Sequence, residues 1–265
     1  MLLYQVKRIL LVFSFTSAVA ANAQNVDQPK IEFDHIVLFV SDDALRDSLN
    51  QIFTPAENLT TVHENQGTTG YYYLFYNTFI ELLYLTDSAK ARINQNRFGS
   101  DYVARWSGKE DVSPIAFGMN MLPWDTAHAK ANYHRYQSLD AAPEEYYLMS
   151  RYNGEQDSPL IYISMPNRAY QSLNSLEDIK SRPAEIREDM RKYLTHSVAA
   201  TELSKVIYST RESAQVPENL MLLRRTSMIK VESSETEQLI LVFGEGQKGS
   251  KEFWVNPDTK LIVRY

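Results

Sequence analysis

The sequence contains no cysteine among its 265 residues. This absence excludes disulfide bonds, thiolate nucleophiles and metal sites built on cysteine. It also excludes a lipid anchor attached to a cysteine after a cleavage site. The chain must fold through its hydrophobic core alone, and with 44% hydrophobic residues it is long enough for one large domain or two small ones.

The chain also lacks an excess of positive charge. Its formal net charge is -6, and the charged residues are spread along the sequence without a basic stripe. Proteins that bind nucleic acid neutralise phosphates with clustered Lys and Arg. We therefore expect no nucleic acid partner.

Three common catalytic motifs are missing as well. The sequence has no Gly-rich phosphate loop, no HExxH helix and no Gly-x-Ser-x-Gly elbow. The signatures of nucleotide-binding proteins, zinc proteases and serine hydrolases of the α/β class are thus absent.

No hydrophobic run is long enough to span a bilayer, which takes roughly 20 apolar residues. The longest, residues 9–20, follows Lys7 and Arg8 and precedes the small-x-small sequence Ala21-Asn22-Ala23. This pattern is typical of a secretory signal peptide. We predict that residues 1–23 are a signal peptide cleaved before Gln24, so that the mature protein is periplasmic or secreted, with no membrane span after cleavage.

The first part of the mature chain is predicted to form a β-α-β-β-β unit. Residues 33–40 are rich in β-branched and aromatic residues and predict a strand buried on both faces. A helix is expected between Asp42 and Pro55, because apolar residues recur there at helical spacing. Three short strands should follow, in a meander separated by turns. These strands are expected at residues 59–63, 71–76 and 79–85.

A weaker copy of the same order begins at Pro114. We expect a strand at residues 115–121, a helix at about residues 126–137, and strands at residues 145–151 and 160–164. His128 and His134 would then lie on the surface of a polar helix. Only three strands are visible in this second copy.

The remainder of the chain is predicted to form a further α+β unit. Apolar residues at helical spacing predict helix over residues 173–194, interrupted at Pro183. Short strands and turns follow to the end of the chain. The expected strands are residues 203–210, 228–231, 238–243, 252–255 and 261–264.

Several of these residues carry a family resemblance. The run Phe33-Asp34-His35-Ile36-Val37, then His63 before Gly67-Thr68, and then Phe79-Ile80-Glu81-Leu82-Leu83, resembles the opening module of glyoxalase-like domains. These domains belong to the vicinal oxygen chelate superfamily. Residues 114–166 look like the second half of such a domain, and Thr195-His196 through Leu203 to Val206 is similar to a C-terminal segment found after it in longer members. The resemblance thus covers nearly all of the mature chain.

The resemblance implies an α+β fold class, with paired β-α-β-β-β modules whose curled mixed sheets surround a cleft, plus a C-terminal α+β unit. The glyoxalase-like domain would span residues 31–170, with modules at about 31–90 and 112–170, and the extension would span residues 171–265. The implied function is binding of a small oxygenated molecule, with lyase, isomerase or dioxygenase activity that uses a divalent metal. The alternative is a non-catalytic protein of the same fold that sequesters a small molecule. A homodimer is compatible with either function.

In this family the first and fourth strands of each module supply metal ligands, which here are His35 and Glu81. Each is the one polar residue among apolar neighbours on its strand face, if side chains alternate regularly. A buried carboxylate needs a partner, so Glu81 is expected to meet His35, another donor, a metal or a ligand. With a metal, Glu81 would act as ligand or as catalytic base.

The second half supplies no such ligands, since its corresponding strands read Ile115-Ala116-Phe117-Gly118 and Ile161-Tyr162-Ile163-Ser164. A catalytic metal site needs about three protein ligands, and only His63 or His196 could complete one. Two interpretations therefore stay open: His35 and Glu81 form an incomplete metal site, or they form a buried hydrogen-bonded couple without an ion.

Two further residues are candidates for ligand binding. His63 lies at a glycine-rich turn, either at the mouth of the cleft or as a solvated loop residue. Arg151 closes a tyrosine-rich strand, where it would either pair with an anionic ligand or serve as an ordinary surface cation.

Overall fold

The computed structural model describes residues 30–98, 103–108, 112–122, 133–136, 147–150, 158–164, 191–210 and 218–265. Over these residues the chain is a mixed α+β protein with two mixed sheets, many strands and few helices. No helix in the described part is long and apolar enough to cross a membrane.

The larger sheet has eight strands in the order β2-β3-β4-β1-β5-β8-β7-β6. Its strands are β1 (Lys30–Val40), β2 (Thr61–His63), β3 (Thr68–Leu74), β4 (Phe79–Leu85), β5 (Ile115–Leu122), β6 (Tyr133–Tyr136), β7 (Tyr147–Ser150) and β8 (Leu160–Ser164). β1 runs parallel to β4, and β5 runs parallel to β8, while β1 and β5 pair antiparallel in the middle of the sheet. The order of β1 to β4 is thus mirrored by that of β5 to β8.

The second sheet has five strands in the order β10-β9-β11-β13-β12. These are β9 (Leu203–Thr210), β10 (Ile229–Ser233), β11 (Glu237–Phe243), β12 (Ser250–Asn256) and β13 (Thr259–Arg264). All five lie where the sequence predicted strands. Local alternation and β-branched residues were a sufficient signal here.

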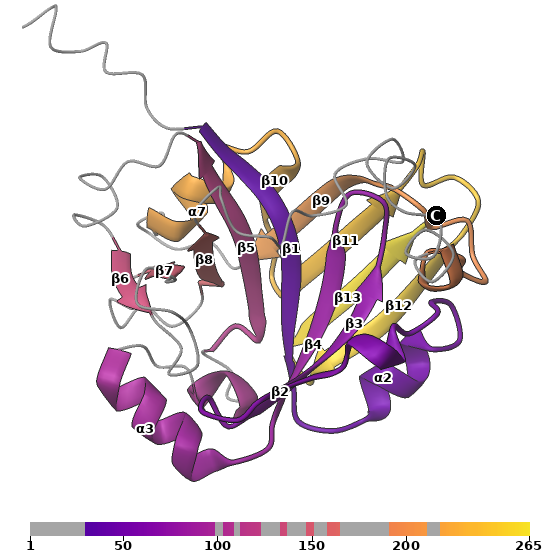
Figure 1. Cartoon of the computed structure of the whole chain (residues 1–265). Coiled ribbons are helices and arrows are strands. Elements are labelled where there is room, and N and C mark those ends of the chain that lie inside the picture. Colours follow the sequence, from indigo (N-terminus) through magenta and orange to yellow (C-terminus); the bar gives the residue numbers. More distant parts are fainter. Residues whose placement is uncertain are drawn as a thin grey trace, which may run out of the picture.

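The two sheets pack face to face around one hydrophobic core (Figure 1). Ring contacts join the layers: Phe75 lies 4.6 Å from Phe243, and Phe117 lies 5.7 Å from Tyr208, between ring centroids. Apolar residues from one face of the eight-stranded sheet and one face of the five-stranded sheet fill this core. The opposite face of the eight-stranded sheet is therefore left for other contacts.

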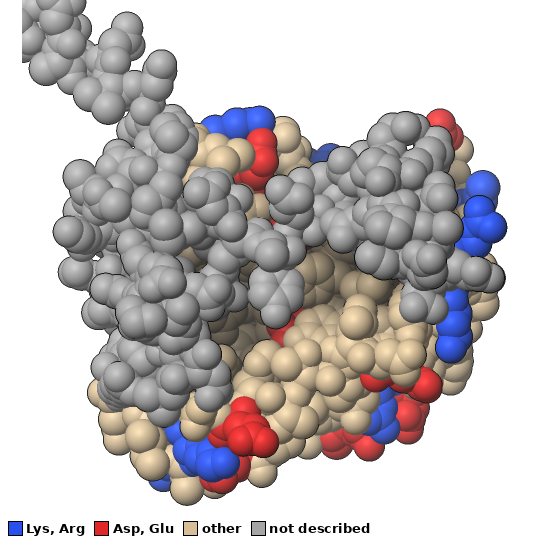
Figure 2. Space-filling view, in the orientation of Figure 1, with Lys and Arg blue, Asp and Glu red and all other residues tan. Residues whose placement is uncertain are grey.

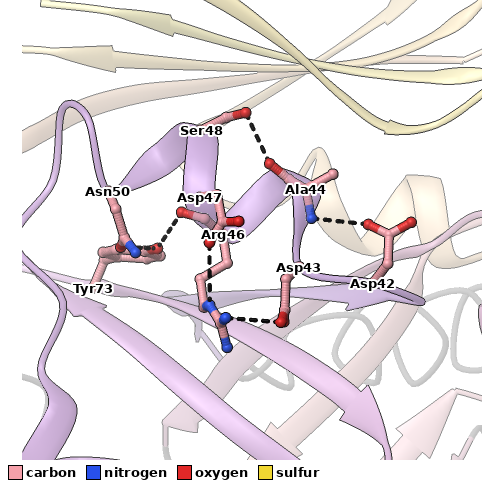
Figure 3. Close-up of polar contacts among 8 residues, drawn as sticks. All are labelled: Asp42, Asp43, Ala44, Arg46, Asp47, Ser48, Asn50 and Tyr73. Atoms are coloured by element: carbon pink, nitrogen blue, oxygen red, sulfur yellow. Dashed lines mark hydrogen bonds and ion pairs between the residues drawn. The ribbon is translucent and has the colours of Figure 1, made fainter.

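Helix α2 (Ala44–Leu49) packs Leu45 and Leu49 into the core between the sheets. Its N-cap residue is Asp43, one residue after the predicted cap Asp42, whose carboxylate accepts the Ala44 N–H at 2.9 Å (Figure 3). It is shorter than the predicted helix. Beyond it, Tyr73 anchors the chain by donating its hydroxyl to Asn50 Oδ1 at 2.8 Å.

Charged side chains gather on the exposed side of α2 in Figure 2. Arg46 pairs with Asp43 at 2.8 Å and lies 5.0 Å above the ring of Tyr71. Ion pairs at such exposed positions contribute little to stability. The Arg46–Asp43 pair is therefore expected to add little to the stability of the fold.

The predicted helix at residues 126–137 is wrong over its last part. Residues Tyr133–Tyr136 form β6, an edge strand that pairs with β7, so His134 lies in a strand. Tertiary pairing with β7 overrides the weak helical preference of this polar segment. Residues 123–132, with His128, lie outside the described residues.

Four helical elements were not anticipated: η1 (Glu57–Leu59), α3 (Ser88–Phe98), η2 (Val103–Trp106) and α7 (Glu218–Leu223). α3 lacks a clear apolar stripe, with Ala91 and Asn94 buried but Ile93 exposed. Of the predicted helix at residues 173–194, only residues 191–194 lie in the described part, and residues 191–193 are helical.

Candidate functional site

His35 owes its position to a β-bulge in β1. Phe33 pairs with Met119, and His35 pairs with Gly118. β1 therefore advances two residues while β5 advances one, and Asp34 is the extra residue of the bulge. A bulge of this kind re-aims the side chains that follow it.

The bulge also changes which residues share a face. Phe33 packs against the core between the sheets, as do Ile36 and Leu38 after the bulge, whereas Val37 and Phe39 lie in a separate apolar cluster. Regular alternation would place Phe33, His35 and Val37 on one face of β1, and the bulge moves Phe33 to the other face. His35 faces away from the core between the sheets.

The imidazole of His35 is held by three neighbours. Its Nδ1–H donates to Asp34 Oδ2 at 2.6 Å. Its ring stacks on Phe79 of β4, with centroids 4.2 Å apart and an interplanar angle of 10°. The ring also lies directly over Gly118, where a Cβ would be 2.2 Å from Nδ1.

Asp34 is itself fixed in place, and its side chain is buried. Its second oxygen, Oδ1, accepts the Asn120 Nδ2–H at 3.3 Å. Its backbone carbonyl accepts the buried hydroxyl of Thr78 at 2.8 Å. The bulge therefore presents a carboxylate of defined orientation to His35.

Glu81 lies on β4, two residues after Phe79 and on the same strand face. Its Oε1 accepts the Tyr72 hydroxyl at 3.1 Å and lies 3.5 Å from His63 Nε2. Gly70 makes room for this group, because a Cβ there would be 2.4 Å from Glu81 Oε1. The side chain of Glu81 is 12% exposed, so the carboxylate is mostly withdrawn from water.

The predicted residues thus share one face of the sheet but have different partners. His35 bonds Asp34, whereas Glu81 bonds Tyr72 and lies beside His63. Within the described residues, the direct hydrogen bond expected between His35 and Glu81 is not formed. Phe79, in contact with the rings of both His35 and Tyr72, links the two groups.

An apolar cluster borders these polar groups on the same face. It contains Val37, Phe39, Leu83, Trp106, Ala116 and Leu160. Trp106, from η2, donates its indole N–H to the Leu83 carbonyl at 2.7 Å and packs edge-on against Phe39. η2 therefore covers the sheet face at Phe39 and Leu83. These residues lie two positions along β1 and β4 from the paired residues Val37 and Glu81.

We tested whether the described residues fit the divalent metal that the resemblance implies. Among them, no group of three or more His, Asp or Glu side chains comes close enough to hold an ion. β5 and β8 contain no such residue at all. The described side chains do not match a three-ligand metal site.

His196 has a structural role in this fold. Its Nδ1 accepts the Thr54 N–H at 3.0 Å, and its Nε2–H donates to the Leu74 carbonyl at 2.9 Å. Burial lowers the pKa of His196 to about 4, and the bond to Leu74 offsets this only in part. Both nitrogens of this neutral ring are used to bind the segment after α2 to β3.

Asp34, Tyr72 and Phe79 were not anticipated as neighbours of the predicted residues. Asp34 directly precedes His35 in sequence, and in a regular strand the two side chains would point to opposite faces. Only the bulge brings them together. The signal available in sequence was the Asp-His pair itself. Arg151 lies outside the described residues.

Comparisons with known proteins give a fold and no family. No family model matches the chain, and no curated protein matches it. One similar solved structure is the crystal structure of a hypothetical protein from Staphylococcus aureus, with a TM-score of 0.50 and 10% sequence identity. The match covers 88% of this chain and 99% of that one, and at this identity it shows similarity of fold alone.

Proposed function

We propose that this chain is a glyoxalase-like protein that binds a small oxygenated molecule on the face of the eight-stranded sheet that carries His35 and Glu81. The mirrored strand order supports the idea of two β-α-β-β-β modules joined through β1 and β5. In the proposed arrangement the sheet curls around the bound molecule.

The observation that carries the proposal is the placement of two polar groups over glycine. His35 lies against Gly118, and the Glu81–Tyr72 pair lies against Gly70. A larger residue at either glycine would fill the space that these side chains occupy. Polar side chains held in this way beside aromatic rings are typical of ligand sites.

The chemistry of the groups indicates what the molecule should offer. The His35 ring, bonded to Asp34 through Nδ1, can accept a hydrogen bond at Nε2, and the Glu81 carboxylate also accepts. The rings of Phe79 and Tyr72 offer an apolar surface next to them. We therefore expect a ligand with at least one hydroxyl donor on a flat or apolar body.

Two functions fit such a site. One is lyase, isomerase or dioxygenase chemistry, in which a divalent metal would need ligands beyond those described. The other is sequestration without catalysis. The neighbouring rings of His35, Phe79 and Tyr72 favour it, because they offer a surface on which a ligand can stack. Elemental analysis of the purified mature protein, with mass spectrometry of any co-purifying molecule, separates the two.

Binding can be tested directly with phenol as the probe and toluene as its match without a hydroxyl, followed by ligand-observed NMR. Phenol should bind more tightly than toluene, and Phe79→Ala and Glu81→Gln should both weaken it. Trp254→Ala is a matched control, because Trp254 is an exposed aromatic residue on the other sheet. Equal binding to all four proteins would refute the proposed site.

A further inference from the structure

η2 contains a buried arginine next to the residue that covers the ligand face. Among the buried residues that the structure describes, Arg105 is the one cation. Its Nη1 donates to the Ser113 carbonyl at 2.6 Å and to the Ser158 carbonyl at 3.4 Å. A buried cation is stabilised by the acceptors and the negative charge around it, and removing one of them is costly.

A carboxylate of the five-stranded sheet supplies negative charge near this arginine. Glu237 begins β11 and is half-buried as a residue. Its Oε1 accepts the Tyr208 hydroxyl at 2.5 Å, and its Oε2 accepts the Thr259 hydroxyl at 2.7 Å. Both donors are buried residues of the same sheet. The carboxylate therefore has a fixed orientation, set from β9 and β13.

The same carboxylate is linked to the segment that leads into β5. The Ser113 hydroxyl hydrogen-bonds it, and the Arg105 guanidinium attracts it. Burial raises the pKa of Glu237, and these two groups, with the Tyr208 and Thr259 hydroxyls, oppose the rise. Glu237 thus connects the second sheet to η2, although the two are far apart in sequence.

Arg105 precedes Trp106 directly within η2. Trp106 donates its indole N–H to the Leu83 carbonyl at 2.7 Å and packs edge-on against Phe39. Because η2 is one short turn of four residues, Arg105 and Trp106 cannot move independently. The contacts that hold Arg105 therefore also hold Trp106 over the sheet face.

We propose that Glu237 is a positioning residue for the ligand site. From the five-stranded sheet, and through Ser113 and Arg105, it holds η2 so that Trp106 stays against the face where the ligand binds. This inference rests on the proposed function. Glu237 itself does not touch the ligand.

The contribution of Glu237 to binding is apolar. Trp106, Phe39 and Leu83 belong to the apolar cluster that borders Glu81, and they offer contacts to the body of the ligand. A displaced η2 would weaken those contacts. The polar groups that bind the ligand hydroxyl would be unchanged.

The first test follows Trp106 without any ligand. In Glu237→Gln the amide oxygen still accepts a hydrogen bond, but the negative charge that attracts Arg105 is gone. The bond from Trp106 to Leu83 should loosen, and the indole N–H should exchange with solvent about tenfold faster or more. ¹H–¹⁵N NMR measures this exchange. An unchanged Trp106 signal in Glu237→Gln would overturn the proposal.

Two controls accompany this measurement. Trp254 is the internal reference, because it is exposed on β12 and its indole signal should not respond. Glu252→Gln is the matched control variant, since it removes an exposed carboxylate from the same sheet and should leave Trp106 unchanged. Trp106→Phe identifies the signal of Trp106. An equal response to Glu252→Gln and Glu237→Gln would count against a specific role of Glu237.

A double-mutant cycle tests the route through Arg105. Arg105→Met removes the buried cation and keeps an apolar side chain. Glu237→Gln should then change the exchange of Trp106 much less in the Arg105→Met background than in the wild type. Equal changes in both backgrounds would contradict the route.

A milder variant keeps the proposal testable if Glu237→Gln does not fold. Tyr208→Phe removes one hydroxyl that fixes the Glu237 carboxylate. The exchange of Trp106 should become faster in this variant too, by a smaller factor. If Tyr208→Phe leaves Trp106 unchanged, Glu237 serves only the five-stranded sheet and the proposal is wrong.

Probe binding separates this inference from the proposed function. Glu237→Gln should weaken phenol and toluene by a similar factor, because both probes place a ring against the apolar contacts. Weaker binding of phenol alone would overturn the positioning of Trp106. If the wild type binds phenol but Trp106 does not respond to Glu237→Gln, only this inference fails. If Trp106 responds but the wild type binds neither probe at this face, the proposed function is wrong, while the hold of Glu237 on η2 stands.

Discussion

A methyl group at residue 118 would lie 2.2 Å from Cε1 of His35, because the imidazole rests directly on the Gly118 backbone. This contact joins β1 to β5 at the centre of the eight-stranded sheet. It makes the position of the His35 ring dependent on a residue more than eighty positions away in sequence.

Gly118→Ala should displace the His35 ring and destabilise the protein by about 1–3 kcal/mol, as overpacking generally does. Urea denaturation measures the change. Combining it with His35→Ala is the control, because removing the ring removes the clash. If Gly118→Ala lowers the free energy of unfolding equally with and without the His35 ring, the ring is not the reason that residue 118 must be glycine.

Val37→Asp should prevent folding, because a charge at this position has no partner. Val37 is buried beside Phe39 and Leu83 and pairs with Glu81, so the new carboxylate would also lie near an existing one. The cost of an unpaired buried charge exceeds about 4 kcal/mol. Val62→Asp is the matched control, since Val62 is 61% exposed on the edge strand β2. Thermal unfolding of both variants decides the matter, and a normal transition in Val37→Asp would contradict a central β1.

His196 should make stability depend on pH. In the folded state its pKa is about 4, whereas its ordinary value is 6.5. Above about pH 6.5 the ring is neutral in both states, and its contribution is complete. As the pH falls from 6.5 towards 4, the unfolded chain binds a proton that the folded protein does not, and up to roughly 3 kcal/mol is lost.

Urea denaturation at pH 7 and at pH 4.5 measures this loss. His196→Asn keeps an acceptor near the Thr54 N–H but does not titrate, so its loss between the two pH values should be smaller than that of the wild type. An identical loss in the two proteins would assign the pH dependence to other groups.

The mature N-terminus should lie at or near Gln24, because a charged start, an apolar run and Ala21-Asn22-Ala23 precede it. Intact-mass measurement of protein from the native envelope tests this. Retention of Met1 in a membrane fraction would show that the segment is an uncleaved anchor.

Several elements were predictable because their signals are local. β4 has the predicted bounds, and β9 does too, since runs of apolar and β-branched residues specify a strand without reference to its partners. β6 was missed because its residues are polar, and an edge strand of this kind forms through its pairing with β7. η2 was missed for a related reason, as the hydrogen bond from Trp106 to Leu83 joins residues far apart in sequence.

The sequence by itself determined that no cysteine chemistry is possible, that β1 and β4 are strands, and that His35 and Glu81 are candidate site residues on them. Tertiary structure decided the partners of these two residues. The bulge at Asp34 exists only in the pairing of β1 with β5, and it turns Asp34 towards His35. Tyr72 reaches Glu81 only through the register of β3 with β4. Register depends on hydrogen bonds between distant segments, so local alternation can identify a candidate residue but not the group to which it bonds.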